Sequence, residues 1–414
     1  MFETEAKRPR AIAAALDTGE YDVEVSLQEL SRLADTAGID VVFEVTQRKD
    51  HPDSGTFFGK GKLDEIKELI ENEEVDTLLF DDELSPMQIR NIENITGLAP
   101  IDRTMLILDI FASQAKTKEG EVQVELAQHR YRLPRLAGAY TAMSRLGGGI
   151  GTRGPGETKL ETDRRYIESR INQLQKELVK IDNHRQLTRR ARLKSGVKSV
   201  AIVGYTNVGK STLLNFLTGA GVLAENKLFA TLDPTARKLT LKDGSEVLMV
   251  DTVGFVSRLP HHLVKAFSST LKESVYADLI LQVCDITSPT LAMEMQTTKE
   301  TLNGLDIGDT PVLTVFNKCD SEGWEENIPA GVKDYMCISA KTGFGVDELL
   351  DKIAEILFAD DIIIKALVPF AQAGLETTLR QKGKLAAVDY RQDGIYLEGK
   401  IAPEYAHLFA PYKV

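Results

Sequence analysis

The chain has 414 residues, of which 43% are hydrophobic and 27% are charged, a balance typical of a globular protein rather than of a disordered chain. At roughly 150 residues per domain, this length predicts two to four domains. The 50 Lys plus Arg and 62 Asp plus Glu give a net charge of −12, and as an average this argues against a nucleic-acid partner.

Several classes of protein are disfavoured by what the sequence lacks. No run of about 20 apolar residues occurs, so we expect no membrane span, although peripheral membrane association stays open. The start, MFETEAKRPR, has no apolar signal core. The three cysteines, Cys284, Cys319 and Cys337, form no CxxC pair, which predicts reduced thiols in a cytoplasmic protein rather than a disulfide or zinc framework.

The first hundred residues alternate between helical and strand patterns. We expect helices near 25–36, 60–73 and 85–95, and strands at 39–45 and 75–80. Alternation of this kind predicts a small parallel α/β domain, to which we assign residues 1–101.

Strand patterns disappear between about 102 and 196. Residues 103–132 and 157–194 are compatible with helices. In the second stretch the apolar residues are spaced by four and three, which is typical of a coiled-coil seam: they are Ile167, Ile171, Leu174, Leu178 and Ile181. We therefore expect an antiparallel helical hairpin over 102–196, with the glycine-rich tip RLGGGIGTRGPGET at 145–158.

The charges of the chain are distributed unevenly. Residues 129–194 hold 16 Lys or Arg and 6 Asp or Glu, a local net charge of +10, so the rest of the chain carries −22. Tyr131, Tyr140 and Tyr166 are interleaved with these cations. A run this biased beside a glycine-rich tip predicts a polyanion-binding arm.

The strongest motif follows the buried strand VKSVAIVG (197–204). Gly204 to Ser211 match GxxxxGK[ST], and the apolar helix start LLNFL comes next, which is the context of a P-loop. Backbone N–H groups of such a loop wrap phosphates at a helix N-terminus. Lys210 is expected to reach the β- and γ-phosphates, and the Ser211 hydroxyl to bind Mg²⁺.

Three more motifs follow in chain order, each after an apolar strand: DTVG at 251–254, NKCD at 317–320 and SAK at 339–341. The carboxylate of Asp320 can accept both N–H groups of guanine, which adenine cannot supply. We therefore expect GTP and GDP rather than ATP. The expected contact residues are Gly204, Tyr205, Thr206, Asn207, Val208, Gly209, Lys210, Ser211, Thr212, Phe229, Ala230, Thr231, Leu232, Asp233, Asp251, Thr252, Val253, Gly254, Asn317, Lys318, Cys319, Asp320, Ser339, Ala340 and Lys341.

The expected fold of residues 197–360 is a doubly wound, mostly parallel sheet with the ligand at the carboxyl ends of its strands. These four motifs resemble the guanine-nucleotide site of the translation-factor-related GTPases. That resemblance makes Thr231, in FATLDPT, a second Mg²⁺ ligand, with Thr235 as the alternative. Lys210, Thr231 and Gly254 are then the expected catalytic residues.

Two positions modify the expected catalysis. Phe255 follows DTVG where a Ras-like enzyme carries the glutamine that orients water, so we expect slow intrinsic hydrolysis that a partner stimulates. Asn207 matches the asparagine with which some related GTPases bind K⁺, which makes K⁺ a second candidate ion. A loop-ordering hydrogen bond by Asn207 is the alternative.

The whole chain resembles the HflX GTPases. FFGKGKLDEI (57–66), DRTMLILDIFASQAKTKEGEVQVELAQHRYRLPRL (102–136) and RLGGGIGTRGPGETKLETDRR (145–165) look like that family's N-terminal hallmarks. The resemblance covers roughly residues 40–360 and is weak over the α/β appendix at 361–414. It implies a GTPase that binds the 50S ribosomal subunit and dissociates stalled or idle 70S ribosomes, notably under stress.

The resemblance also implies that the loop around 145–158 is directed toward the peptidyl-transferase region. The basic arm (129–194) would then contact 23S rRNA, and we expect a monomer. A ribosome-assembly GTPase acting on 50S precursors is the main alternative. Two others are a GTP-regulated RNA-modifying enzyme and a protein-binding switch that uses the coiled coil for docking.

Overall fold

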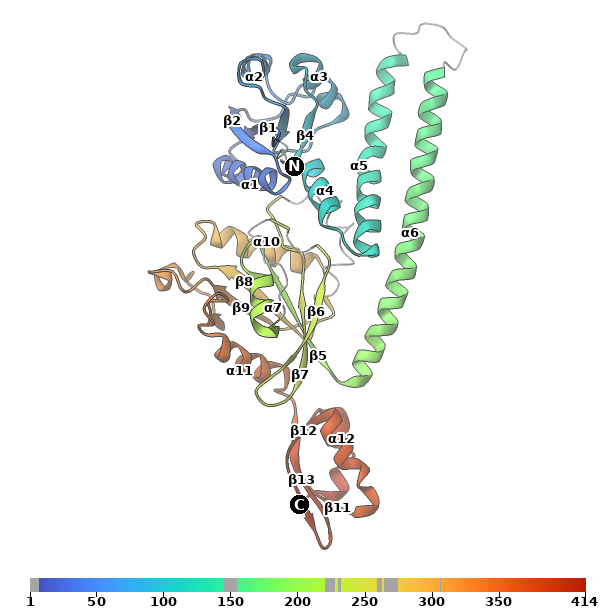
Figure 1. Cartoon of the computed structure of the whole chain (residues 1–414), viewed down its shortest axis with the longest axis vertical. Coiled ribbons are helices and arrows are strands. Elements are labelled where there is room, and N and C mark those ends of the chain that lie inside the picture. The colour runs from blue at the N-terminus through green and yellow to red at the C-terminus, as the bar shows by residue number, and fades with distance from the viewer. Residues whose placement is uncertain are drawn as a thin grey trace, which may run out of the picture. The chain divides into compact units, whose positions relative to one another are not determined.

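The computed structural model describes residues 7–144, 155–219, 228–229, 232–258, 263, 275–305 and 307–414 (Figure 1). Its contacts divide the chain into two units. The first unit comprises Met1–Asp182 with the segments Glu225–Asp233 and Val256–Ser268. The second unit comprises Asn183–Ala224, Pro234–Phe255 and Ser269–Val414.

The first unit contains a four-stranded parallel sheet in the order β2-β1-β3-β4. The strands are β1 (Arg10–Asp17), β2 (Asp40–Arg48), β3 (Thr77–Phe80) and β4 (Pro100–Asp102). The helices are α1 (Val23–Thr36), α2 (Lys60–Glu73), α3 (Pro86–Thr96) and α4 (Arg103–Gln114). The expected three helices and two strands are confirmed, but β1 and β4 were missed.

Strand β1 carries the sequence RAIAAALD, and its alanine content hides its strand character. It lies between β2 and β3, and Ala11 through Ala15 are fully buried. Small side chains suit a central strand that is covered on both faces. The surrounding core includes Ile12, Leu16, Phe58 and Phe80.

The prediction of one helix over 103–132 was wrong, because the chain breaks between α4 and α5 (Lys118–Ser144). Ala115 adopts an extended conformation. Thr117 then starts the next helix, since its hydroxyl oxygen accepts a hydrogen bond from the backbone N of Gly120 at 3.0 Å. A threonine that caps a helix in this way favours a new start over continuation.

Helix α6 (Pro155–Ser195) is 41 residues long and runs beside α5 in Figure 1. Leu174 is buried with Val122 and Leu126 of α5, and Ile171 and Leu178 pack against this cluster. These contacts confirm the central part of the predicted seam. The glycine-rich tip (145–154) lies outside the described residues.

The second unit contains a six-stranded sheet in the order β10-β9-β8-β5-β7-β6. Its strands are parallel except for β6, which pairs antiparallel with β7. They are β5 (Lys198–Gly204), β6 (Thr235–Thr240), β7 (Glu246–Asp251), β8 (Leu279–Asp285), β9 (Val312–Asn317) and β10 (Tyr335–Cys337). Its helices include α7 (Lys210–Thr218), α10 (Leu291–Gly304) and α11 (Val346–Leu357). The expected mostly parallel sheet over residues 197–360 is confirmed.

The C-terminal appendix is a separate three-stranded antiparallel sheet in the order β11-β13-β12. Its elements are β11 (Ile362–Val368), α12 (Gly374–Lys382), β12 (Gly383–Arg391), β13 (Gly394–Ile401) and α13 (Pro403–Ala406). Leu379 of α12 is buried against the sheet together with Leu397 and Phe409.

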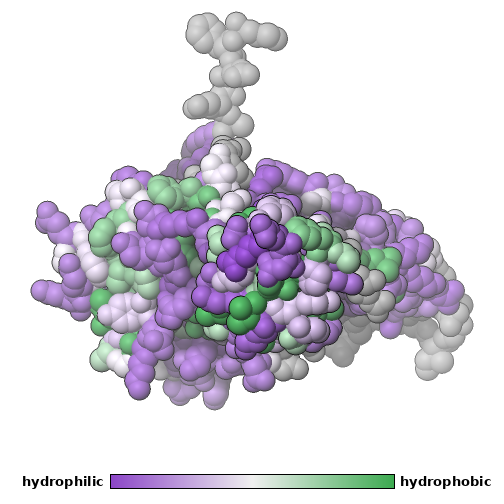
Figure 2. Space-filling view, turned by 90° about the horizontal axis from the view of Figure 1, so that it is seen from below, coloured by the Kyte–Doolittle hydropathy of each residue, from purple (hydrophilic) through white to green (hydrophobic). Residues whose placement is uncertain are grey.

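The outer surface is mainly hydrophilic in the view of Figure 2, where hydrophobic residues form small patches rather than a broad band. Among the described residues, no helix is both long enough and apolar enough to span a membrane.

Candidate nucleotide site

The P-loop joins the carboxyl end of β5 to the start of α7. Gly204 has φ +152°, and a Cβ there would lie 2.1 Å from the backbone O of Val283. Gly209 has φ +95°, and a Cβ there would lie 2.3 Å from Nδ2 of Asn317. Because only glycine fits at both positions, the backbone of this loop can approach a ligand closely.

Lys210 is the first residue of α7 and is 6% exposed. Its ammonium donates hydrogen bonds to the backbone O of Tyr205 at 2.7 Å and of Gly204 at 3.2 Å. Burial lowers the pKa of Lys210 to about 8, opposed by the charge of Asp251. A buried cation beside the phosphate-binding loop suits a polyanionic ligand, which restores the lost electrostatic stabilisation.

Ser211 and Asp251 place two oxygen donors together. The Ser211 hydroxyl donates to Oδ2 of Asp251 at 2.7 Å, and Asp251 is buried at the carboxyl end of β7. A hydroxyl and a carboxylate are the ligands that Mg²⁺ prefers in nucleotide sites. These residues therefore fit a Mg²⁺ ion that also binds phosphate oxygens.

The DTVG turn closes over the P-loop. A Cβ at Gly254 would lie 3.0 Å from Nζ of Lys210 and 2.7 Å from Cγ2 of Thr206. Phe255 bonds to the P-loop on both sides, since its N donates to the backbone O of Gly204 at 3.1 Å and its O accepts from the N of Thr206 at 2.8 Å. The Oγ1 atom of Thr206 is buried with no hydrogen-bond partner among the described residues, which leaves it available to a ligand.

The base-binding edge is organised by Asn317, which is 3% exposed at the end of β9. Its Nδ2 donates to the backbone O of Val208 at 2.7 Å, and its Oδ1 accepts from the N of Ala340 at 2.9 Å. Asn317 thus ties the P-loop to the SAK motif. Asp320 and Lys341 are exposed at this edge, whereas Ser339 is fully buried.

The structure brings four of the predicted groups to one edge of the sheet in the second unit. These are the P-loop residues 204–212 and the segments 251–254, 317–320 and 339–341. Thr235 is the first residue of β6 and pairs with Asp251. Ala230 and Thr231 lie outside the described residues.

Three other predicted contacts, Phe229, Leu232 and Asp233, belong to the first unit. The ring of Phe229 packs edge-to-face on Phe111 of α4, with centroids 4.7 Å apart. The Asp233 carboxylate accepts hydrogen bonds from the backbone N of Lys116 and of Thr117, directly before α5. A nucleotide contact by these three residues stays a prediction.

Arg258 was not predicted from the sequence. It lies four residues after Gly254 and donates to Oδ2 of Asp81 at 2.6 Å and also to Asp82. Its guanidinium stacks on the ring of Tyr21, with Cζ 4.0 Å from the centroid. The only signal in the sequence was the pair of acidic residues 81–82, which follows a strand and indicates a cation partner. No sequence pattern identified Arg258 as that partner.

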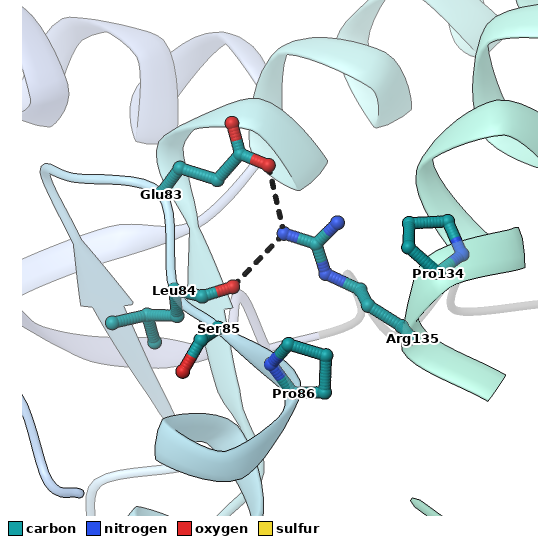
Figure 3. A pocket seen from close by; sticks show the side chains of 6 residues that line it. All are labelled: Glu83, Leu84, Ser85, Pro86, Pro134 and Arg135. Carbon is teal, nitrogen blue, oxygen red and sulfur yellow. Dashed lines mark hydrogen bonds and ion pairs between the residues drawn. The ribbon is translucent and has the colours of Figure 1, made fainter. Parts of the chain in front are cut away.

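A separate pocket of about 330 Å³ lies in the first unit between the start of α3 and α5 (Figure 3). Arg135 spans it and donates to Oε1 of Glu83 at 3.1 Å and to the backbone O of Leu84 at 3.0 Å. Arg135 also covers the ring of Tyr131, whose hydroxyl donates to the buried Asp102 at 2.8 Å. Tyr131 is 5% exposed, so its ring is part of the core beside α5.

Comparison with known proteins supports the assignment of a GTP-binding site. Family profiles described as "GTP-binding GTPase N-terminal", "GTP-binding GTPase Middle Region" and "50S ribosome-binding GTPase" match residues 24–112, 114–192 and 199–318. "GTPase HflX" of Lacrimispora saccharolytica is 48% identical, over 98% of this chain and 96% of its own length. "GTPase HflX" of Escherichia coli is 42% identical, over 82% of this chain and 80% of its own length.

Among solved structures, a Sulfolobus solfataricus GTP-binding protein in complex with GDP is 26% identical and has a TM-score of 0.45. The match covers 84% of this chain and 98% of the Sulfolobus protein. With a relative 48% identical along nearly its whole length and three GTPase profiles in order, the chain belongs to the HflX family of GTPases, and its reaction is the hydrolysis of GTP.

Proposed function

We propose that the protein binds the 50S ribosomal subunit in its GTP form, dissociates stalled or idle 70S ribosomes in the cytoplasm, and leaves after hydrolysis. The observation that carries the proposal is the family match, which includes a domain described as a ribosome-binding GTPase. It coincides with a helical arm whose net charge of +10 contrasts with the acidic remainder of the chain.

The arm supplies the surface for rRNA. Arg132, Arg164, Arg165, Lys176 and Lys180 are exposed on α5 and α6. Arg164 and Arg165 form ion pairs within α6, with Glu168 and Glu161, each at 2.9 Å. Exposed pairs of this kind are worth less than about 1 kcal/mol, so phosphates can replace the carboxylates. Structured RNA is recognised mainly through such backbone and shape contacts.

The nucleotide site supplies the switch. Lys210 would bind the β- and γ-phosphates, Ser211 would bind Mg²⁺ directly, and Asp251 would hold the same ion through water. Asp320 would select guanine, while Thr231 or Thr235 would complete the Mg²⁺ shell in the GTP form. The ion would offset the charge that develops on the phosphates.

Intrinsic hydrolysis is expected to be slow. Phe255 is 4% exposed and has no group that orients water. The 50S subunit would therefore have to supply or order the missing group.

The four proposed domains comprise residues 1–101, 102–196, 197–360 and 361–414. We also propose that the protein is a monomer.

Ribosome assembly is the second candidate function, because a precursor 50S particle offers the same RNA chemistry. Depletion would separate the two: precursor particles support assembly, whereas accumulated 70S or stalled particles support dissociation. RNA modification is less favoured, because burial raises the pKa of Cys284 and Cys319 to about 12. Such thiols are poor nucleophiles.

A pelleting experiment tests the proposal. The protein is sedimented with 50S, 30S and 70S particles in the presence of GDP or a non-hydrolysable GTP analogue, and 70S splitting is followed by light scattering. We expect GTP-dependent binding to 50S and splitting of 70S. Equal binding with GDP and the analogue would contradict the switch.

Charge variants locate the binding surface. Neutralising Arg145, Arg153, Arg164 and Arg165 to glutamine should abolish pelleting while leaving GTP affinity unchanged. The matched control neutralises Lys238, Lys242, Lys352 and Lys365, four ion-paired lysines of the second unit. Equal losses in both variants would indicate a general charge effect instead of a site.

A further inference from the structure

Residues 317–320 form a turn whose backbone conformation is unfavourable by itself. Lys318 has φ +67°, in the left-handed region that residues with a Cβ rarely adopt. Its carbonyl oxygen accepts hydrogen bonds from Ser321, from N at 3.2 Å and from Oγ at 3.0 Å. Contacts from outside the turn must hold this conformation, and the Lys318 side chain provides one.

The ammonium of Lys318 lies 2.5 Å from Oδ2 of Asp285, the last residue of β8. The other oxygen of Asp285 accepts hydrogen bonds from Thr287, at 3.0 Å from N and 2.7 Å from Oγ1. The Asp285 side chain is 15% exposed. The carboxylate is therefore fixed by its own turn before it meets the lysine.

Asp285 and Asn317 are paired neighbours in the register of β8 and β9. Asn317 fixes the first residue of the turn to the P-loop and to Ala340, while Asp285 fixes the second residue by its side chain. Asp320, the exposed residue proposed to bind guanine, follows two positions later. Its direction depends on the conformation at Lys318, because successive backbone dihedrals set where the next side chains point.

We propose that Asp285 is a positioning residue of the guanine site, which acts through Lys318 and makes no contact with the nucleotide itself. Removing its charge frees the lysine, allows the turn to leave the left-handed conformation and turns Asp320 away from the base. The proposal rests on the proposed guanine site, and GDP binding by the unaltered protein tests that site separately.

The test compares Asp285→Asn, Lys318→Met and the double variant in the full chain. The amide keeps the shape of Asp285 and can still accept from Thr287. GDP and inosine diphosphate, which lacks the exocyclic amine, are measured by equilibrium binding and by release rate. We expect Asp285→Asn to weaken GDP binding by about three- to ten-fold, mainly through faster release, and to reduce the preference for GDP over inosine diphosphate.

The double variant distinguishes positioning from general support. If Asp285 acts through Lys318, the double variant binds GDP as well as Lys318→Met alone. The control is Asp278→Asn, which removes a similar carboxylate that binds Lys198 at 3.3 Å and Ser199 N at 2.8 Å in the same unit. It should leave GDP selectivity unchanged.

Normal GDP binding by Asp285→Asn, or additive losses in the double variant, would overturn the positioning role. A failure of the unaltered protein to prefer GDP over ADP would instead overturn the guanine site. Thermal melting of each variant identifies loss of folding. If Asp285→Asn fails to fold, GDP binding by Lys318→Met tests the same contact independently.

Discussion

The carboxylate of Asp233 accepts hydrogen bonds from the backbone N of Lys116 and of Thr117, each at 2.8 Å, directly before helix α5 begins. The Thr117 hydroxyl also donates to Asp233 and accepts from the N of Gly120. A residue that follows the proposed switch threonine by two positions thus supports the start of helix α5. The proposed switch segment and helix α5 therefore share this contact.

Asp233→Ala should lower the free energy of unfolding by about 1 kcal/mol, the usual effect of losing a cap. It should also reduce the difference between the GTP and GDP forms in 50S binding. Differential scanning calorimetry and pelleting with each nucleotide measure the two effects. An unchanged nucleotide dependence would show that Asp233 only stabilises the helix.

Gly120→Ala separates the contact of Asp233 with the start of α5 from the stability of the helix itself. A Cβ at Gly120 would lie 2.5 Å from Oδ1 of Asp233, whereas alanine favours the helix by up to about 1 kcal/mol. We expect little change in melting but the same loss of nucleotide dependence as in Asp233→Ala. Gly374→Ala, which meets no atom within 4 Å at the start of α12, is the matched control.

The sequence predicted the parts whose signal is local. The P-loop, the three motifs after apolar strands and the seam around Leu174 depend on spacing within short windows, and they were found where expected. Strand β1 was missed because alanine does not indicate a strand, although its small size suits the centre of the sheet. The contacts of Asp233 and Arg258 could not be predicted, since each joins segments more than 100 residues apart.

Potassium dependence is expected to follow Asn207. This residue is exposed with φ +64°, a conformation that asparagine tolerates better than most residues. We expect GTP hydrolysis to be faster in K⁺ than in Na⁺ by at least about ten-fold, as for loss of one charge-stabilising group. Asn207→Gly keeps the backbone conformation and should remove that difference. Equal rates of the unaltered protein in both buffers would exclude the ion.

The buried Lys210 predicts a pH dependence of nucleotide binding. Its pKa is about 8 in the free protein, and bound phosphates favour the charged form. Binding therefore takes up a proton above pH 8, and the Kd for GDP should rise by up to ten-fold per pH unit between about 8 and 9. Calorimetry in buffers of different ionisation enthalpy measures this uptake. A constant Kd from pH 7 to 9 would contradict it.

The last prediction concerns Arg103, which is 2% exposed in the first unit. Its guanidinium lies 2.6 Å from Oδ1 of Asp81, whose side chain is fully buried, and also bonds to Glu29. Arg103→Ala leaves the buried carboxylate of Asp81 with Arg258 as its remaining cation, so it should lower the free energy of unfolding by up to about 3 kcal/mol. Urea denaturation measures the loss.

Two comparisons make the Arg103 prediction specific. Arg8→Ala removes an exposed arginine that bonds to Asp35 at 2.8 Å, and it should destabilise the protein far less than Arg103→Ala does. Arg103→Ala combined with Asp81→Ala removes both charges of the buried pair, so the double variant should be less destabilised than the sum of the single variants. Additive losses would mean that packing, rather than the lost pairing with Asp81, accounts for the effect of Arg103→Ala.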